Sequence, residues 1–294
     1  MRLLWLLLLI VGPVASAAVY SLPEKGSLLG KASTYVVKKG QSFEEIARLK
    51  GEGPLNIIAA NPGLDPLLPP AGSRIKLPSQ LLLPNTPHQG IVINLAELRL
   101  YYYPPNGQEV YVFPVGIGRI GLDTPLGTTR IINKKANPTW TPTADTRKRL
   151  EEQGKTLPQV VPAGPNNPLG LFAMRLGFDK GEYLIHGTNE DVGIGMRVSA
   201  GCIRLEPKDI EDLFAKVPVH TTVRVINQPV KTAIEPDGKV YLEVHEPLSH
   251  PGRDRSLTMT KAQRALLAKP FINARKVQQA MLHQSGLPVL IGHQ

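Results

Sequence analysis

Proline and glycine place the strongest limit on what this chain can fold into. Its 294 residues include 28 prolines and 27 glycines, about one such residue in every five. Proline interrupts helices and central strands, and glycine weakens both, so a bundle of long helices is excluded. Because 42% of the residues are hydrophobic, the short segments between these interruptions can still bury cores. We expect a loop-rich, mainly β architecture in two or three domains.

The charge balance favours an anionic partner. Lysine and arginine outnumber aspartate and glutamate by 34 to 24, which gives a formal net charge of +10. Such a surplus attracts nucleic acid, acidic lipid or a carboxylate-rich polymer. The basic residues form no run of five, and aromatic side chains are not interleaved with them. Nucleic acid is therefore the weakest of the three, and we expect no nucleic-acid partner.

The N-terminus has the features of a secretory signal peptide. Arg2 supplies a positive charge, residues 3–11 form an apolar run, and Ala15-Ser16-Ala17 has the small-x-small form that signal peptidase cleaves. A transmembrane helix needs about 20 apolar residues, so this run is too short to span a bilayer. We predict a Sec-type signal peptide over residues 1–17, with an uncleaved N-terminal anchor as the alternative. No later segment is apolar enough to cross a membrane, so we expect no integral span.

The predicted export limits the roles that the single cysteine, Cys202, can have. An oxidising compartment favours disulfides, but one cysteine cannot form an internal one. Free cysteine is either buried and inert or retained because its reactivity is used. Both interpretations stay open at this point.

Residues 34–78 form a self-contained unit with the order strand, helix, helix, strand. Ser42 and Glu45 make a capping box that opens the first helix, and Asn61-Pro62-Gly63 ends the second. The unit resembles a LysM domain at Tyr35-Val36-Val37-Lys38-Lys39-Gly40-Gln41-Ser42-Phe43, Ile46-Ala47, Asn61-Pro62 and Ile75-Lys76-Leu77-Pro78. LysM domains bind glycans that contain N-acetylglucosamine, so the resemblance implies binding to peptidoglycan glycan. A small spacer fold without binding is the alternative.

A β-rich domain is predicted over residues 90–227, after a linker at residues 79–89. The expected strands are residues 91–95, 98–103, 110–115, 131–132, 171–176, 183–185 and 223–226, with one helix that begins at Pro207. The proline-rich stretch 140–169 contains the basic cluster Arg147-Lys148-Arg149. A connection of that length is usually a functional loop or a lid.

The tail, residues 228–294, is predicted to be a small α+β appendage. Residues 230–234 and 239–244 flank Pro236-Asp237-Gly238 as a hairpin, and Thr260 opens helical sequence that Pro270 interrupts. No residue pattern in the tail suggests chemistry.

One glycine motif is misleading. The segment Gly116-Ile117-Gly118-Arg119-Ile120-Gly121 matches the dinucleotide-binding fingerprint letter for letter. That fingerprint needs a helix whose N-terminus holds the pyrophosphate, and the following Leu122-Asp123-Thr124-Pro125-Leu126-Gly127 cannot propagate one. We therefore reject a nucleotide cofactor.

The segment from His186 to Arg204 carries the candidate chemistry. His186 stands at the end of an apolar strand, and Cys202 follows it after a glycine-containing loop. A thiol is mostly protonated at neutral pH, and a neighbouring imidazole can take its proton and later return it to a leaving amine. Gly201 lets the backbone approach closely, so amide hydrogens around Cys202 could hold an oxyanion.

The remaining histidines are expected to be solvated or satisfied rather than catalytic: His88, His220, His245, His250, His283 and His293. The sequence contains no HExxH or CxxC pattern, and one cysteine with one nearby histidine offers too few ligands for zinc. We expect neither a metal nor another cofactor.

Residues 90–227 strongly resemble the YkuD-type L,D-transpeptidases, in particular the ErfK/YbiS/YcfS/YnhG branch. The resemblance rests on Gly116-Ile117-Gly118-Arg119, Thr124-Pro125-Leu126-Gly127, the Trp140 loop, Gly164-Pro165-Asn166-Asn167-Pro168-Leu169-Gly170, His186-Gly187-Thr188 and Ser199-Ala200-Gly201-Cys202-Ile203-Arg204. It implies an L,D-transpeptidase β-sandwich with one helix. By resemblance, Cys202 is the nucleophile, His186 the general acid/base, and the Gly187 carbonyl orients the imidazole. Gly201, Arg204 and Ser199 are expected to serve the substrate or the oxyanion. Ala200 departs from the histidine or serine of many members.

The implied reaction is transpeptidation of peptidoglycan stem peptides in the periplasm. The thiolate attacks the carbonyl of the third residue, diaminopimelate, in a tetrapeptide and releases D-Ala. An amine then resolves the thioester, either from another stem (a 3→3 cross-link) or from a lysine of an outer-membrane lipoprotein. The resemblance also implies acylation by carbapenems. A carboxypeptidase or cysteine endopeptidase and a non-catalytic peptidoglycan-binding protein remain as alternatives.

Overall fold

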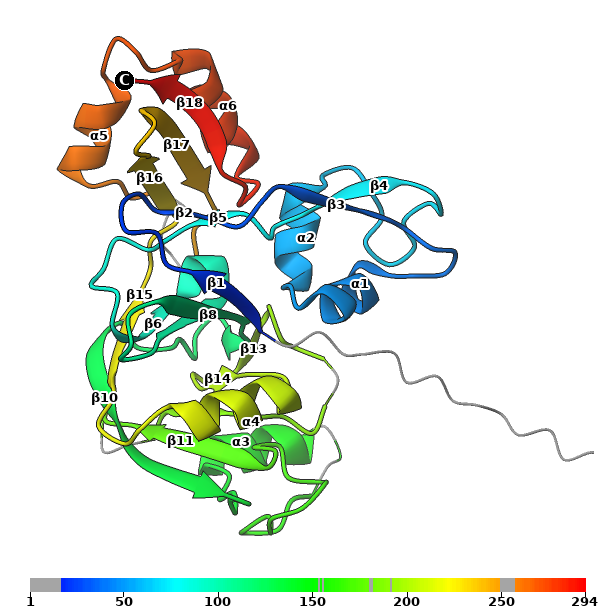
Figure 1. The fold of residues 1–294 in the computed structure, drawn as a ribbon. Helices are drawn as coiled ribbons and strands as arrows, with labels where there is room; N and C mark the ends of the chain where they lie inside the picture. Colours follow the sequence, from blue (N-terminus) through cyan, green and yellow to red (C-terminus); the bar gives the residue numbers. More distant parts are fainter. Residues whose placement is uncertain (1–16, 153, 155, 180–181, 191, 249–256) are drawn as a thin grey trace, which may run out of the picture.

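The computed structural model describes residues 17–152, 154, 156–179, 182–190, 192–248 and 257–294. Three compact units are visible in Figure 1: an N-terminal unit of two short helices and two paired strands, a large central sheet, and a C-terminal unit of three strands and two helices. The predicted signal peptide lies outside the described residues except for Ala17. His250 also lies outside them.

The central sheet confirms the mainly β prediction. Nine strands are ordered β1-β8-β7-β6-β15-β10-β11-β12-β14. Their bounds are β1 (Ala18–Ser21), β6 (Gly90–Asn94), β7 (Arg99–Tyr103), β8 (Glu109–Pro114), β10 (Gly127–Ala136), β11 (Phe172–Leu176), β12 (Leu184–His186), β14 (Ile203–Arg204) and β15 (Thr222–Ile226). Strand β1 was not predicted. It begins directly after the predicted signal peptide and pairs antiparallel with β8.

Strand β10 joins the two halves of this sheet. Its first residues pair with β15, its later residues pair with β11, and the register shifts between Ile131 and Asn133. The sheet therefore curls, and the two halves enclose one core of aliphatic side chains. Helix α4 (Pro207–Lys216) begins at the predicted proline and adds Ile210 and Leu213 to that core.

The N-terminal unit has the predicted element order. It consists of β3 (Ser33–Val36), α1 (Phe43–Lys50), α2 (Pro54–Ala60) and β4 (Arg74–Leu77). The capping box is confirmed, because the Ser42 hydroxyl accepts from the Glu45 amide and the Glu45 side chain accepts from the Ser42 amide. Phe43, Ile46 and Ile57 are fully buried in a core that belongs to this unit alone.

The predicted linker, residues 79–89, is only partly a linker. Its segment β5 (Leu81–Leu82) pairs with β2 (Leu28–Leu29). Leu81 and Leu83 are buried together with Tyr101 and Tyr103 on the outer face of the central sheet. The leucines of this stretch therefore cover that face of the sheet.

The C-terminal unit contains the predicted hairpin and the predicted helix start. Its elements are β16 (Val230–Ile234), β17 (Lys239–Val244), α5 (Lys261–Leu267), α6 (Ala274–His283) and β18 (Val289–His293). The hairpin pairs Val230 with Val244, and Thr260 caps α5 in a capping box. Strand β18, which pairs with β17, was not predicted.

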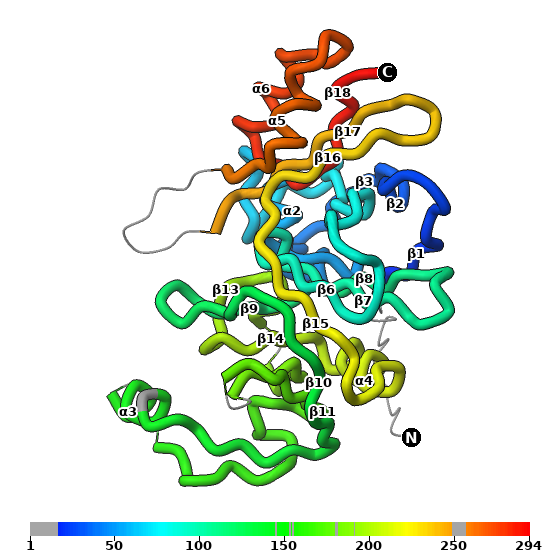
Figure 2. The backbone as a smooth tube through the Cα atoms, turned by 90° about the vertical axis from the view of Figure 1, so that its left-hand side faces the viewer, coloured from blue at the N-terminus to red at the C-terminus, as the bar shows by residue number. Residues whose placement is uncertain are grey.

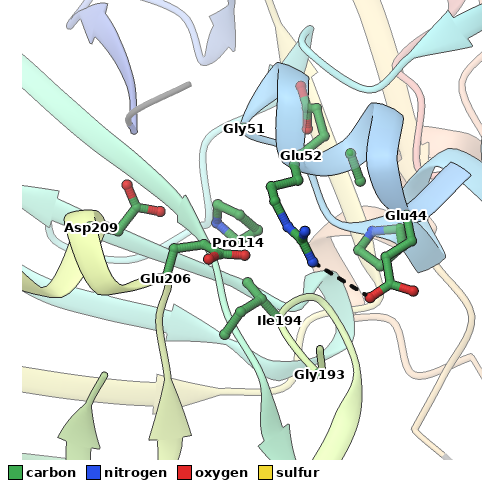
Figure 3. Close-up of a pocket in the computed structure, with 11 residues that line it drawn as sticks. Glu44, Gly51, Glu52, Pro114, Gly193, Ile194, Glu206 and Asp209 are labelled. Atoms are coloured by element: carbon green, nitrogen blue, oxygen red, sulfur yellow. Dashed lines mark ion pairs between the residues drawn. The ribbon is translucent and has the colours of Figure 1, made fainter. Parts of the chain in front are cut away.

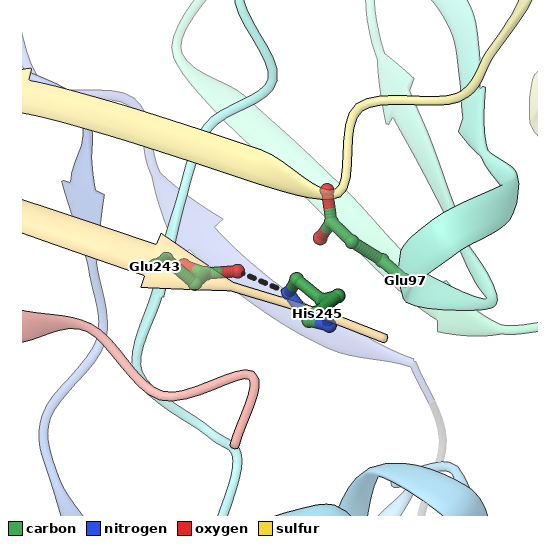
Figure 4. Close-up of side chains that lie close together, drawn as sticks. All are labelled: Glu97, Glu243 and His245. Atoms are coloured by element: carbon green, nitrogen blue, oxygen red, sulfur yellow. Dashed lines mark hydrogen bonds and ion pairs between the residues drawn. The ribbon is translucent and has the colours of Figure 1, made fainter. Parts of the chain in front are cut away.

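A buried ionic network holds the C-terminal unit to the central sheet. The Lys231 ammonium lies 2.9 Å from Glu97 Oε2 and 2.8 Å from Glu243 Oε1. His245 Nε2 lies 2.6 Å from the same Glu243 oxygen (Figure 4). Glu97, Glu243 and His245 are the one group of metal-ligand type among the described residues. Because Lys231 contacts both carboxylates, it already supplies the cation at that point.

The same network reaches the N-terminal unit. Arg99 of β7 lies 3.7 Å from Glu97 and 3.6 Å from Glu52, which follows α1. The Arg99 side chain is 4% exposed and that of Glu52 is 10% exposed. All three units therefore meet at one set of buried charges.

An acidic hollow lies between the N-terminal unit and α4 (Figure 3), and Glu52 of the ionic network forms part of its wall. Glu44, Glu52, Glu206 and Asp209 line it. The backbone amide of Ala17 donates to Asp209 at 3.1 Å. Burial, reinforced by the Glu206 charge, raises the pKa of Asp209 to about 7. The lining residues include no thiol and no hydroxyl side chain.

Candidate active site

Two neighbouring parallel strands bring the candidate catalytic residues together. Strand β12 ends at His186, β14 begins one residue after Cys202, and Ile185 pairs with Ile203. Ile185 and Ile203 point into the core, where both are fully buried. Because side chains alternate along a strand, His186 and Cys202 share the opposite face. The fold thus places on one face of the sheet two residues that a 15-residue segment separates in the sequence.

The hydrogen bond of His186 fixes its tautomer. His186 is 3% exposed, and its Nδ1 lies 2.6 Å from the carbonyl oxygen of Gly187. A carbonyl can only accept, so Nδ1 carries the hydrogen and Nε2 keeps the lone pair. Burial, together with the Arg204 charge, lowers the pKa of His186 to about 4. The imidazole is therefore neutral at pH 7, with Nε2 available as a base.

The thiol of Cys202 is protonated in the same state. Burial raises its pKa above the ordinary value, although a backbone hydrogen bond from Leu184 and the charges of Arg204 and Arg175 oppose that rise. The residue still keeps part of its surface exposed. The resting pair is thus a neutral thiol beside a neutral imidazole, not a thiolate–imidazolium ion pair.

The loop before Cys202 is held by two buried hydroxyls. Ser199 Oγ accepts from the Gly201 amide at 3.1 Å and donates to the Cys202 carbonyl at 2.6 Å. Thr124 Oγ1 donates to the Gly201 carbonyl at 2.9 Å and accepts from the Gly118 amide at 3.1 Å. Both polar groups of Gly201 are thus engaged, and Ser199 is 3% exposed. This geometry makes Ser199 and Thr124 positioning residues for the cysteine loop.

Gly201 is required by its conformation as well as by its contacts. Its φ of +102° lies in the left-handed region, and a Cβ there would lie 2.6 Å from the Tyr183 ring. Sequence reasoning placed Gly201 near the oxyanion but did not identify Thr124 as its partner. The sequence motif that contains Thr124 is Thr124-Pro125-Leu126-Gly127, which contributes to the family resemblance but does not by itself point to Gly201.

Arg204 lies close to both His186 and Cys202. Its backbone forms paired hydrogen bonds with Gly116, at 2.8 and 2.9 Å. Its guanidinium lies 3.6 Å from Glu190. The charge of Arg204 acts on His186 and on Cys202, lowering the pKa of each. The structure therefore places Arg204 next to the candidate cysteine–histidine pair and connects it to the surrounding loops.

A cavity of about 560 Å³ opens in front of the thiol. Its walls come from β10, β11, β12, the cysteine loop and the segment that follows Trp140. His186 is not in the lining, because it is buried beneath that surface. The cavity gives a substrate access to Cys202.

The proline-rich stretch 140–169 forms one wall of this cavity, but it is not purely a loop. It contains helix α3 (Ala144–Glu152), which was not predicted and lies at the edge of the molecule in Figure 2. Trp140 and Val161 exchange backbone hydrogen bonds at 2.9 and 2.7 Å. The helix escaped prediction because its sequence, ADTRKRLEE, has no apolar stripe.

The misleading glycine motif forms a strand and a turn. Strand β9 (Ile117–Gly118) pairs with β13 (Arg197–Ser199). A Cβ on Gly118 would lie 2.3 Å from the Leu122 carbonyl oxygen, so the glycine permits this close approach. No helix begins within residues 119–126, all of which are described. The segment therefore lacks the helix N-terminus that a pyrophosphate site needs.

Comparison with known proteins identifies the family. The profile of the L,D-transpeptidase catalytic domain matches residues 88–225, and that of the L,D-transpeptidase C-terminal domain matches residues 229–291. The probable L,D-transpeptidase YcfS of Escherichia coli is 48% identical over 94% of this chain and 88% of its own length. The chain belongs to the L,D-transpeptidase family. Members of this family are cysteine-dependent acyltransferases that act on peptidoglycan, and this L,D-transpeptidase contains a single cysteine, Cys202.

Further relatives agree with this assignment. The probable L,D-transpeptidase ErfK/SrfK of E. coli is 46% identical over 97% of this chain and 94% of its own length. The solved catalytic domain of an E. faecium L,D-transpeptidase matches 49% of this chain and 100% of that domain at 22% identity, with a TM-score of 0.36. That score is too low to add to the assignment. In the described part of this L,D-transpeptidase, no helix is both long and apolar enough to cross a membrane.

Proposed function

We propose that Cys202 and His186 carry out the acyl transfer. His186 Nε2 takes the thiol proton as Sγ attacks the carbonyl of the third residue, diaminopimelate, in a tetrapeptide stem. The same nitrogen gives the proton to the leaving amine, so D-Ala departs and a thioester remains on Cys202. The observation that carries this proposal is the hydrogen bond from His186 Nδ1 to the Gly187 carbonyl, which leaves Nε2 as the base on the face shared with the thiol.

The protonation states support general-base catalysis rather than a preformed thiolate. The pKa of His186 is lowered to about 4, and that of the Cys202 thiol is raised above its ordinary value. Both shifts disfavour proton transfer from the thiol to the imidazole before substrate binds. The proton therefore moves during attack on the carbonyl. The positive charge of Arg204 then disfavours the imidazolium that forms on His186. This repulsion favours early transfer of the proton from His186 to the leaving amine.

The developing oxyanion needs donors near Cys202. We assign this role to the backbone amide of Cys202 rather than to that of Gly201, because Ser199 already accepts from the Gly201 amide. Ser199 and Thr124 then act indirectly, by holding the loop in the conformation that presents the amide. Such preorganised donors contribute about 10²- to 10³-fold to the rate.

The acceptor is an amine in this proposal. An amine of a second stem would give a 3→3 cross-link, and a lysine of an outer-membrane lipoprotein would give an anchored protein. The test is incubation with purified disaccharide-tetrapeptides, followed by product masses. We expect cross-linked dimers and free D-Ala from the wild type and neither from Cys202→Ala. Tripeptides without dimers would identify a carboxypeptidase, and unchanged tetrapeptides a non-catalytic protein. A parallel incubation with purified cross-linked dimers tests for an endopeptidase, which would cleave them.

We infer that residues 34–78 are a LysM domain that binds peptidoglycan glycan. The resemblance and the strand–helix–helix–strand order support this, and the unit has its own core. Sedimentation with purified sacculi tests it, using the isolated segment after circular dichroism has verified its fold. A folded segment that stays in the supernatant would refute the binding role.

We also propose the division of the precursor and its location. The signal peptide covers residues 1–17, the catalytic domain residues 90–227 and the C-terminal appendage residues 228–294, and the processed protein acts in the periplasm. The N-terminal sequence and the peptidoglycan substrate support export. N-terminal sequencing of the protein isolated from cells tests this division, because an unprocessed Met1 would indicate an anchor.

A further inference from the structure

Two rows of side chains cross the open face of the sheet at the active site. The registers place Asn133 opposite Arg175 and Arg175 opposite Leu184. The next pair, Ile185 with Ile203, and a backbone hydrogen bond from Leu184 to the thiol put Leu184 beside Cys202. We call Asn133, Arg175, Leu184 and Cys202 the thiol row. The next row along the strands is Lys135, Ala173, His186 and Arg204. All four members of the thiol row line the cavity in front of Cys202.

Arg175 lies on this surface at a defined separation from the thiol. It is exposed on β11, whereas its strand neighbours Met174 and Leu176 are buried in the core. Adjacent strands lie about 4.8 Å apart, so two strand spacings put the Cα of Arg175 about 10 Å from that of Cys202. The charge of Arg175 also acts on the Cys202 thiol. A guanidinium thus faces the site where the acyl group is bound.

The residue between them in the thiol row is apolar. Leu184 is the one residue of the thiol row that separates Arg175 from Cys202. A ligand anchored at the thiol and extending along the row would therefore pass over an aliphatic side chain before it met the guanidinium. This order suits an aliphatic chain that ends in a carboxylate.

We propose that Arg175 binds the side-chain carboxylate of the donor's third residue and makes the enzyme selective for stems that carry it. The inference rests on the proposed function, because Cys202 must hold the carbonyl of that residue. The three methylene groups of a diaminopimelate side chain would then lie over Leu184, and the distal carboxylate would reach the guanidinium. Arginine suits this role because its planar fork can bind both carboxylate oxygens.

A pair of matched donors tests the proposal. One disaccharide-tetrapeptide has the free side-chain carboxylate, and the other has that group amidated. A hydrogen-bonded charge pair of this kind corresponds to about 10- to 100-fold in kcat/KM. We expect the wild type to prefer the free carboxylate by that factor. Arg175→Gln should lose the preference through slower reaction of the free form alone, and Arg175→Lys should keep part of it.

Two controls show whether the effect belongs to Arg175 and to this carboxylate. Arg130→Gln removes an exposed arginine of β10 that does not line the cavity, and it should leave both rates within about twofold. A donor ending in D-alaninamide tests the other nearby carboxylate, and its rate relative to the D-Ala donor should not change in Arg175→Gln. Equal loss on free and amidated donors, or a changed D-alaninamide ratio, would overturn the assignment. D-Ala release from neither donor by the wild type would instead refute the proposed function, and this inference with it.

Discussion

Removing the ammonium of Lys231 should destabilise the protein strongly. Lys231 is 3% exposed and lies within 3 Å of two carboxylates, those of Glu97 and Glu243, that are fully buried. In Lys231→Met the aliphatic part of the side chain remains, but both carboxylates lose this partner. Breaking a buried pair from one side costs about 3–5 kcal/mol, because an uncompensated charge is left behind. We expect the free energy of unfolding, measured by urea denaturation at pH 7, to fall by that amount.

The pH dependence gives this prediction a distinctive signature. Burial by itself would raise the pKa of Glu243, but Lys231, His245 and Arg99 together hold it well below the ordinary 4.5. In the wild type this group therefore contributes stability above pH 4.5 that is lost as the pH falls further. Without Lys231, burial should raise the folded-state pKa above 4.5. The loss of unfolding free energy in Lys231→Met, relative to the wild type, should then be largest at pH 7 and become smaller towards pH 4.

Two further variants sharpen the comparison. Lys216→Met removes a lysine whose ammonium pairs with Asp212 at 2.6 Å in a partly exposed position, and it should cost less than about 1 kcal/mol. Adding Glu243→Gln to Lys231→Met removes one of the stranded charges and should recover part of the loss. A deficit below about 1 kcal/mol for Lys231→Met, or one that does not change between pH 4 and pH 7, would refute this account of the network.

Two other predictions concern the active site. Because the Cys202 pKa is raised and His186 is neutral, alkylation of Cys202 by iodoacetamide should rise about tenfold per pH unit up to pH 8, as thiolate forms; a plateau below pH 7 would indicate a preformed ion pair. Gly201→Ala places a Cβ 2.6 Å from the Tyr183 ring at a φ of +102°, and such strain should slow acylation about tenfold or more. Gly121→Ala, at a φ of +85° with no atom within 4 Å, is its control and should acylate normally.

Local signals allowed parts of the fold to be predicted. The Ser42 capping box and the turn at Pro236-Asp237-Gly238 depend on residues close in sequence, and both appear as expected. Strands β1 and β18 were missed because each is defined by pairing with a distant partner. Helix α3 was missed because it is polar on all sides.

In the candidate site, too, local sequence patterns identified some residues, whereas the contacts between distant segments could not be predicted. The resemblance singled out His186 and Cys202, but no local pattern could show that two short parallel strands would set them on one face. Thr124 was hard to recognise because its partner Gly201 is 77 residues away. Arg175 looks in sequence like any exposed strand residue, and only the register places it in the thiol row.

The most direct test of the account is the mass of the acylated enzyme. The wild type is mixed with a disaccharide-tetrapeptide donor alone, quenched in acid, digested and mapped by mass spectrometry. We predict a thioester on the peptide that contains Cys202, with the mass of the donor less D-Ala, and its disappearance when an amine acceptor is added. His186→Gln should form it about 10²- to 10⁴-fold more slowly, the usual contribution of a general base. An acyl group on another residue, or D-Ala release by Cys202→Ala, would contradict the central claim.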